Sequence, residues 1–180
     1  MKIKIFCLIL LFFALGISTY PQSITEATID IIHSEFGKEV KTESSKYIIP
    51  GKLKNEIEKT AGQHFYSDAV YIFKVTKKDS IISVGILDNV YGKSLPITFL
   101  VLYKLNGDIL STYVVKYREP YGGGVRIKSW NDQFKGKNTE SGFKVGDDIE
   151  SISGATISVR SLTIGIRKLT LLFEAIKGKL

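Results

Sequence analysis

The spacing of apolar residues along the chain changes from a helical period to a strand period and back again. Within 24–36, four apolar residues recur at helical intervals, and Gly37 follows as a residue that commonly ends helices. These four residues are Ile24, Ala27, Ile31 and Ile32. A second short helix is predicted over 52–61, because this segment follows Pro50-Gly51 and stops at Gly62.

Four segments rich in β-branched and aromatic residues follow and are predicted to be strands. They span 70–75, 80–87, 96–104 and 109–117. Alternation in the third segment places on one face Ile97, Phe99, Val101 and Tyr103. Alternation in the fourth does the same for Ile109, Tyr113, Val115 and Tyr117. Asn106-Gly107 predicts a type I′ hairpin turn, since both residues tolerate positive φ, and Asp79 marks a weaker turn between the first two strands.

The rest of the chain is predicted to be a loop over 118–153, with a short helix around 130–134, followed by a long helix over 155–177. One apolar stripe of this long helix consists of Leu162, Ile166, Leu169, Phe173 and Ile176. Off the stripe lie Arg160, Arg167, Lys168 and Lys177. We expect an α+β fold in which this helix packs on a mainly antiparallel sheet of four or more strands, with short N-terminal helices.

The first twenty residues differ from the rest of the chain. Lys2 and Lys4 precede an apolar run over 5–16, and small or polar residues follow, which is the pattern of an export signal. The run is shorter than the roughly 20 apolar residues of a membrane-spanning helix, so an uncleaved anchor is the alternative. We expect a signal or anchor over 1–20, an N-terminal helical segment over 21–66 and a main domain over 67–180, located in the periplasm or another extracytoplasmic compartment.

Composition narrows the chemistry of the exported part. Cys7 is the only cysteine of the 180 residues and lies inside the predicted signal, which excludes disulfides and thiolate metal sites elsewhere. The net charge of +7 comes from scattered lysines, so we predict a solvated basic surface and no nucleic-acid partner, with association with anionic membrane surfaces as the second interpretation. His33 and His64 lack partners at metal-ligand spacing, so no metal site is predicted.

Small and hydroxylated residues mark the entry into the long helix. The segment Ser153-Gly154-Ala155-Thr156 leads into the helix, and Ser158 follows. A helix N-terminus carries unpaired N–H groups and partial positive charge, and small residues let an anion approach them, so this is a candidate phosphate site. The physical alternative is an ordinary helix cap with Ser153 as the capping residue.

The same segment resembles the flavin-attachment motif of the FMN-binding domain family, because Glu150 stands three positions before its serine. This family includes the FMN-bearing subunits of the Rnf complex and of the sodium-pumping NADH:quinone oxidoreductase. The resemblance implies that a flavin transferase joins FMN through its phosphate to Thr156. The family usually has Asp at the position of Glu150, so the resemblance leaves covalent attachment less secure than FMN binding.

Two further blocks are similar to the family in the same order. The first runs from Tyr117 to Gly124 and the second from Trp130 to Lys137, and they look like the family's Glu-Thr-Pro-Gly-rich loop and Gln-Phe-x-Gly-Lys stretch. In the first block Pro120 follows Glu119 directly, so the family's threonine is absent. A weaker similarity covers 88–93, near the family's Gly-Tyr-Gly turn. The resemblance extends from about residue 71 to the C-terminal helix.

The resemblance implies roles for individual residues. The phosphate is expected on Gly154, Ala155 and Thr156, with a hydroxyl hydrogen bond from Ser153 or Ser158. The loop of Gly122, Gly123 and Gly124 is expected to approach the flavin ring closely. Glu119 is expected either to bind the ring or ribityl chain or to pair with Arg118 or Arg126. Tyr121 and Trp130 are candidates for stacking on the ring, with a core or lid role as the alternative for Trp130.

Three functions follow from these observations. The first is an exported flavoprotein that exchanges electrons with membrane or extracytoplasmic redox proteins, with FMN attached to Thr156. The second is a module that binds or senses FMN without a covalent bond, and the third is an exported interaction domain without cofactor. The chain contains no nucleophile–base arrangement typical of a hydrolase, so no catalytic residue is predicted, and an electron-transfer protein is favoured over a stand-alone enzyme.

Overall fold

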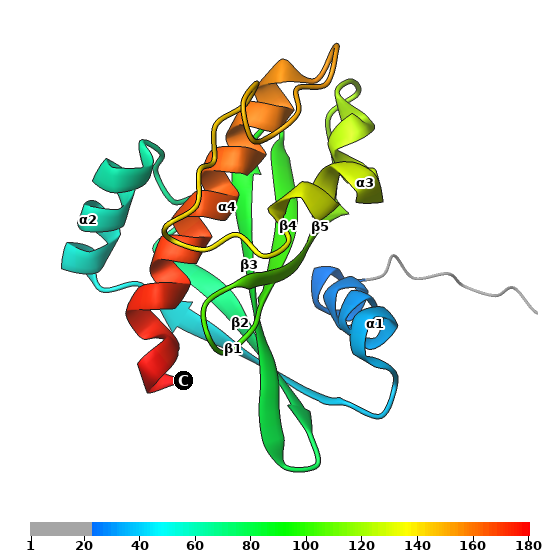
Figure 1. Ribbon diagram of the computed structural model, residues 1–180, viewed down its shortest axis with the longest axis vertical. Coiled ribbons are helices and arrows are strands. Elements are labelled where there is room, and N and C mark those ends of the chain that lie inside the picture. The colour runs from blue at the N-terminus through cyan, green and yellow to red at the C-terminus, as the bar shows by residue number, and fades with distance from the viewer. Residues whose placement is uncertain (1–22) are drawn as a thin grey trace, which may run out of the picture.

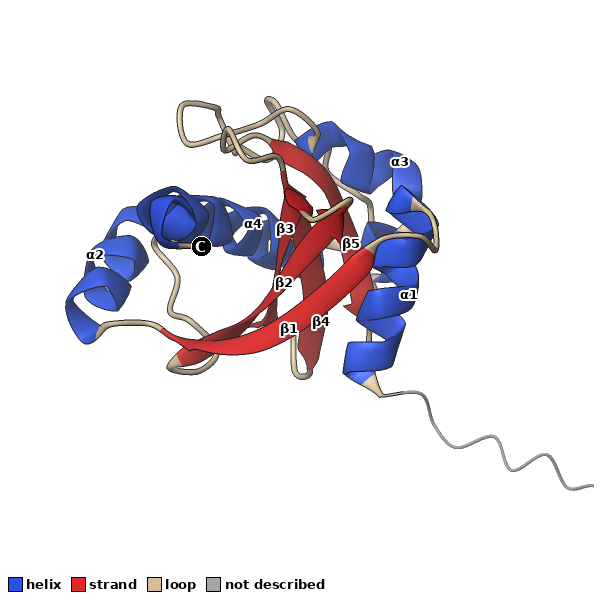
Figure 2. Cartoon of the chain, turned by 90° about the horizontal axis from the view of Figure 1, so that it is seen from below, coloured by secondary structure: helices blue, strands red, loops and turns tan. Residues whose placement is uncertain are grey.

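The computed structural model describes residues 23–180, which form one five-stranded antiparallel sheet with helices on both faces (Figure 1, Figure 2). The strands lie in chain order and are β1 (Lys41–Ile48), β2 (Ala69–Lys77), β3 (Ser80–Tyr91), β4 (Pro96–Tyr103) and β5 (Ile109–Lys116). The helices are α1 (Ile24–Phe36), α2 (Gly51–Ala61), α3 (Lys128–Asn131) and α4 (Thr156–Ile176). The predicted α+β class is therefore confirmed. The predicted signal over 1–20 lies outside the described residues.

Both N-terminal helices occur where the pattern predicted them. A capping box opens α1, since Ser23 accepts from the N–H of Glu26 and the Glu26 carboxylate accepts from the N–H of Ser23. Gly62, which follows α2, has the left-handed conformation that commonly ends helices. None of the helices in the described part of the chain is long and apolar enough to cross a membrane.

The apolar pattern did not predict β1. All eight of its residues pair with β2, from Lys41 opposite Thr76 to Ile48 opposite Ala69. It forms the edge of the sheet, and six of its residues are exposed. The segment 21–66 is therefore not only helical, because it contributes a strand to the same sheet as the main domain.

The sheet is buried on both faces. The α4 side contains the predicted β4 face of Ile97, Phe99, Val101 and Tyr103, and the α1 side contains Leu100 and Leu102. The prediction for β5 was wrong, because Ile109 and Tyr117 face the α4 side whereas Tyr113 and Val115 face the α1 side. Register shifts opposite Leu102/Tyr103 and Thr98/Phe99 each insert one extra β5 residue, which reverses the side-chain direction.

The type I′ turn was predicted between β4 and β5, but it lies between β2 and β3. Lys78 and Asp79 both have positive φ, of 49° and 61°, as a type I′ turn between β2 and β3 requires. In the loop between β4 and β5 only Gly107 has positive φ, and Lys104 donates to the carbonyl of Asp108 across a longer connection. The turn predicted to be type I′ is therefore a wider loop.

The long helix α4 lies along the sheet and carries the predicted apolar stripe into the core. All five stripe residues are at most 1% exposed. Lys168, which was expected off the stripe, is fully buried, and its Nζ donates to the carbonyl of His64 and lies 3.5 Å from Oδ2 of Asp88. The prediction from its charge was wrong, because the long side chain of Lys168 reaches buried acceptors.

Candidate functional site

A cleft of about 500 Å³ opens at the end of the molecule where α4 begins. Three segments form its walls: the turn between β3 and β4, the loop after β5, and the start of α4. Its lining residues are Lys93, Ser94, Leu95, Glu119, Pro120, Tyr121, Gly122, Gly154, Ala155, Thr156, Ile157 and Ser158. The structure thus brings together most of the residues that the resemblance marked, although they come from separate segments of the chain.

The start of α4 is open toward the cleft. Its N-cap residue is Ala155, and no side chain among the described residues caps it. The first helical hydrogen bond runs from the N–H of Val159 to the carbonyl of Ala155, which leaves the three preceding N–H groups without a helical acceptor. The prediction that Ser153 caps the helix is therefore wrong.

Thr156 is exposed at the first position of α4 and borders the cleft. Gly154 just before it has a φ of 76°, a conformation that favours glycine, and a Cβ there would meet no atom within 4 Å. Ser153 is also exposed, but it does not line the cleft. An anion at this end of a 21-residue helix would meet unpaired N–H groups, a hydroxyl and the positive end of the helix dipole.

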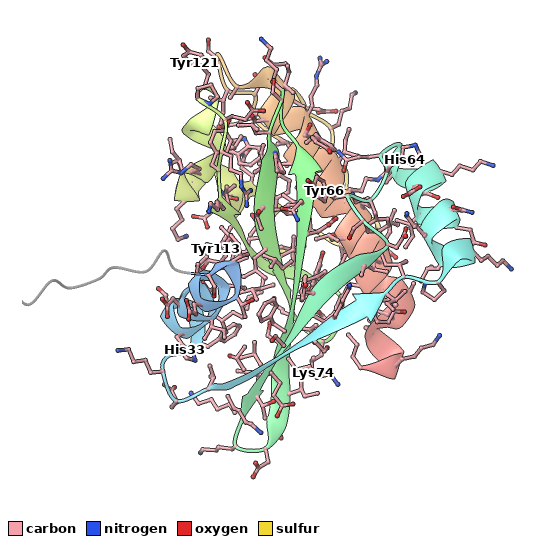
Figure 3. The ribbon with its side chains drawn as sticks, turned by 180° about the vertical axis from the view of Figure 1, so that it is seen from behind. His33, His64, Tyr66, Lys74, Tyr113 and Tyr121 are labelled. Carbon is pink, nitrogen blue, oxygen red and sulfur yellow. The ribbon has the colours of Figure 1, made fainter. Side chains whose placement is uncertain are left out.

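The glycine-rich loop contributes one of its three glycines to the cleft. Gly122 lines it with a φ of 81°, next to Tyr121, which is 83% exposed (Figure 3). Gly123 and Gly124 instead belong to a short 3₁₀ helix, Gly123–Arg126, and do not line the cleft. A Cβ on Gly124 would lie 3.0 Å from Ile152, so this glycine serves the packing of the loop before α4.

Glu119 joins two walls of the cleft. Its Oε1 accepts hydrogen bonds from the N–H of Ser94 at 2.5 Å and of Leu95 at 2.8 Å. These amides lower the pKa of Glu119, so the side chain carries negative charge at neutral pH. Arg118 donates instead to Pro96 and Thr98, so the alternative in which Glu119 pairs with this arginine is wrong.

Trp130 does not line the cleft. It is 5% exposed, stacks edge-on against Phe134, and its Nε1 donates to the carbonyl of Glu150. Gln133 accepts from the N–H of Glu150, so two side chains of this segment hold the loop that leads into α4. The structure thus supports the core role for Trp130, and Glu150 itself is exposed.

Some lining residues had no predicted role. Ser94, Leu95 and Ile157 border the cleft, and Lys93 was noted only in the weakest of the similar blocks. Leu95 and Ile157 are 42% and 47% exposed, which gives the cleft an apolar rim. Gly92 in the β3–β4 turn is the sequence feature that could have indicated this wall. A Cβ at this position would lie 2.6 Å from Oε1 of Glu119, so the close approach of the two segments requires glycine.

Titratable side chains also lie outside the cleft, among them His64 and Glu58. Within residues 23–180 there is no group of three or more His, Cys, Asp or Glu side chains that could hold a metal ion. His64 Nδ1 lies 2.7 Å from Oε2 of Glu58, an arrangement on the surface beside α2.

The comparisons with known proteins agree with this geometry. Residues 92–170 match the model of the FMN-binding domain family, and every residue that lines the cleft lies within this range. The resemblance that the three similar blocks indicated is therefore confirmed over this range.

The chain is also similar to one curated protein and to one solved structure. It is 31% identical over 100 residues to one component of the ion-translocating oxidoreductase complex of Erwinia tasmaniensis, an alignment that covers 49% of this chain and 48% of the relative. The chain thus spans about half the length of this curated relative. The fold is similar to that of NqrC from Shewanella oneidensis, with a TM-score of 0.54 and 17% identity over 82% of this chain and 86% of the other.

Proposed function

We propose that this chain is an exported flavoprotein of extracytoplasmic electron transfer, with FMN attached through its phosphate to Thr156. One observation carries the proposal: Thr156 is exposed at the uncapped start of α4, on the border of the cleft. A modified residue must be accessible to the modifying enzyme, and a phosphate diester retains negative charge. The first turn of α4 meets both requirements.

The residues of the cleft fit a flavin nucleotide. A volume of about 500 Å³ lies within the range of roughly 300–1,000 Å³ that is usual for cofactor sites. The free N–H groups of α4 would hold the phosphate, and the apolar rim of Leu95, Tyr121 and Ile157 would contact the ring. When bound, FMN supplies one- and two-electron redox chemistry. The role of this chain's residues is to hold the cofactor, orient it and limit its exposure to water.

The partners follow from the same proposal. A flavin transferase would recognise the exposed segment around Glu150, whose side chain is one methylene longer than the usual Asp. The relationship to a component of an ion-translocating oxidoreductase complex supports a redox partner at a membrane. The predicted export signal or anchor over 1–20 would bring the domain to the extracytoplasmic side of that membrane.

The mass of the intact protein tests the attachment. The full chain is produced together with an active flavin transferase and compared with its Thr156→Ala and Thr156→Ser variants. Formation of the ester bond removes one water, so we expect the mass to rise by that of FMN less water in the wild type and in Thr156→Ser, which retains a hydroxyl. The alanine variant should show no increase, and Ser153→Ala is the control that should.

Three outcomes separate the functions. The expected mass increase supports covalent attachment. Yellow protein without a mass increase would replace it with non-covalent FMN binding, which the substitution of Glu150 for Asp favours. Colourless protein under all conditions would leave an interaction domain without cofactor.

A further inference from the structure

The hydroxyl of Tyr117 lies where two walls of the cleft meet. Tyr117 follows the last residue of β5, and its ring packs at the edge of the core on the α4 side. The hydroxyl contacts the carbonyl oxygen of Tyr121 in the loop after β5, and it lies 2.9 Å from Oγ of Ser158 in the first turn of α4. A single side chain therefore connects the glycine-rich loop to the start of the helix.

The directions of these two hydrogen bonds follow from the available protons. A phenol has one proton and a carbonyl oxygen can only accept, so Tyr117 donates to Tyr121. Ser158 must then donate its own hydroxyl proton to the oxygen of Tyr117. Ser158 is 5% exposed and has no further proton for the cleft, so it does not fill the expected role of donor to the flavin phosphate.

Gly122 completes this junction. A Cβ at this position would lie 2.8 Å from the hydroxyl of Tyr117 and 3.1 Å from Oγ of Ser158. Its φ of 81° is also a conformation that favours glycine. The loop can thus approach the helix only because residue 122 has no side chain, and the two hydroxyls fill the space that this leaves.

We propose that Tyr117 is a positioning residue of the flavin site. It does not line the cleft. It acts by holding the 121–122 loop against the first turn of α4, and so sets the place of Thr156, two residues before Ser158, relative to the opposite wall. This inference rests on the proposed attachment of FMN to Thr156. It predicts that loss of the Tyr117 hydroxyl, which lies outside the cleft lining, slows the attachment of FMN to Thr156.

The test compares two tyrosine-to-phenylalanine variants of the full chain. Tyr117→Phe retains the ring and removes both hydrogen bonds, and Ser158→Ala removes only one of them. Tyr113→Phe is the matched control, because Tyr113 lies on β5, just before Tyr117 in the chain, but donates to Glu35 of α1 on the other side of the sheet (Figure 3). Each variant is measured for its unfolding midpoint, for amide hydrogen exchange without flavin, and for its initial rate of flavin attachment.

We expect Tyr117→Phe to exchange the amides of Ile127 and Val159, which are hydrogen-bonded next to the junction, faster than the wild type. It should also be modified about 10- to 100-fold more slowly, because small displacements of a reacting group have effects of this size. Ser158→Ala should be intermediate. Tyr113→Phe should match the wild type in both measurements. A wild-type rate in Tyr117→Phe, or an equal loss in Tyr113→Phe at a similar unfolding midpoint, would overturn the positioning role.

The hydrogen-exchange measurement keeps this inference separate from the proposed function. It needs no flavin, so it reports on the junction even if Thr156 is never modified. Unchanged exchange of the amides of Ile127 and Val159 in Tyr117→Phe would refute the junction. Absence of a mass increase in the wild type would refute the attachment instead.

Discussion

A methyl group at Gly165 tests how closely α4 packs on the sheet. Gly165 lies in the middle of this helix, and a Cβ there would lie 2.6 Å from Cγ1 of Val90 and 3.1 Å from Cζ of Phe99. Both neighbours are buried, at 3% and 1% exposure. The substitution Gly165→Ala therefore has two opposing effects on stability: alanine favours the helix, but its methyl group does not fit between the helix and the sheet.

The magnitudes favour destabilisation. Replacing glycine by alanine in a helix interior gains about 1 kcal/mol. Inserting a methyl group into a close-packed core costs about 1–3 kcal/mol, and the upper part of this range applies because Val90 is β-branched and stiff at χ1. We expect Gly165→Ala to lower the free energy of unfolding by about 1–2 kcal/mol, measured by urea denaturation followed by circular dichroism.

Two further variants isolate the cause. In a Val90→Ala background the methyl group has room, so most of the loss from Gly165→Ala should disappear, as a double-mutant cycle would show. Gly51→Ala places a methyl at the start of α2 with no atom within 4 Å, and should be neutral or stabilising by up to about 1 kcal/mol. An increase in stability of Gly165→Ala over the wild type would refute the close approach of helix and sheet.

The remaining predictions concern a turn, a buried acid and a cleft wall. Replacing Lys78-Asp79 by Asn-Gly should raise the free energy of unfolding by about 1 kcal/mol, since both positions have positive φ, and denaturation curves would show it. Burial raises the pKa of Asp88 from 3.8 to about 6, despite the nearby Lys168, so the folded state binds this proton more tightly. The stabilisation from protonated Asp88 is present below pH 4 and is lost as the pH rises through 6. The free energy of unfolding of the wild type should therefore fall by up to about 3 kcal/mol between pH 4 and 7 relative to that of Asp88→Asn. Parallel plots of unfolding free energy against pH for the two proteins would contradict this. Glu119→Gln should speed hydrogen exchange of the amides at 94–95, because a neutral acceptor holds them less strongly.

The apolar pattern predicted the elements that bury apolar residues, and it failed where burial is absent or where side-chain direction depends on tertiary contacts. The strand β1 has six exposed residues, so its sequence carries no alternation to detect. The two bulges of β5 depend on pairing with β4, which no local pattern records. Lys168 was expected outside the core because it is charged, but Asp88 and the carbonyl of His64 provide its surroundings only in the folded chain.

The candidate site was predicted in part for a similar reason. The motif around Thr156 and the loop around Gly122 were both expected to contact one cofactor, and Thr156 and Gly122 line the same cleft. The places of Glu119 and Trp130 depend on which backbone groups lie beside them after folding: the amides of the β3–β4 turn for one and the carbonyl of Glu150 for the other. Residue type indicates what a side chain can bind, whereas its partner is set by the tertiary structure.

Peptide mapping of flavin-loaded protein tests the central claim most directly. Cleavage after Lys144 and Arg160 releases the peptide 145–160, which contains the hydroxyls of Ser151, Ser153, Thr156 and Ser158. Fragmentation of this peptide by tandem mass spectrometry should place the added mass of FMN less water on Thr156. The added mass on any of the three serines, or on a different peptide, would contradict the assignment of the open start of α4 as the attachment site.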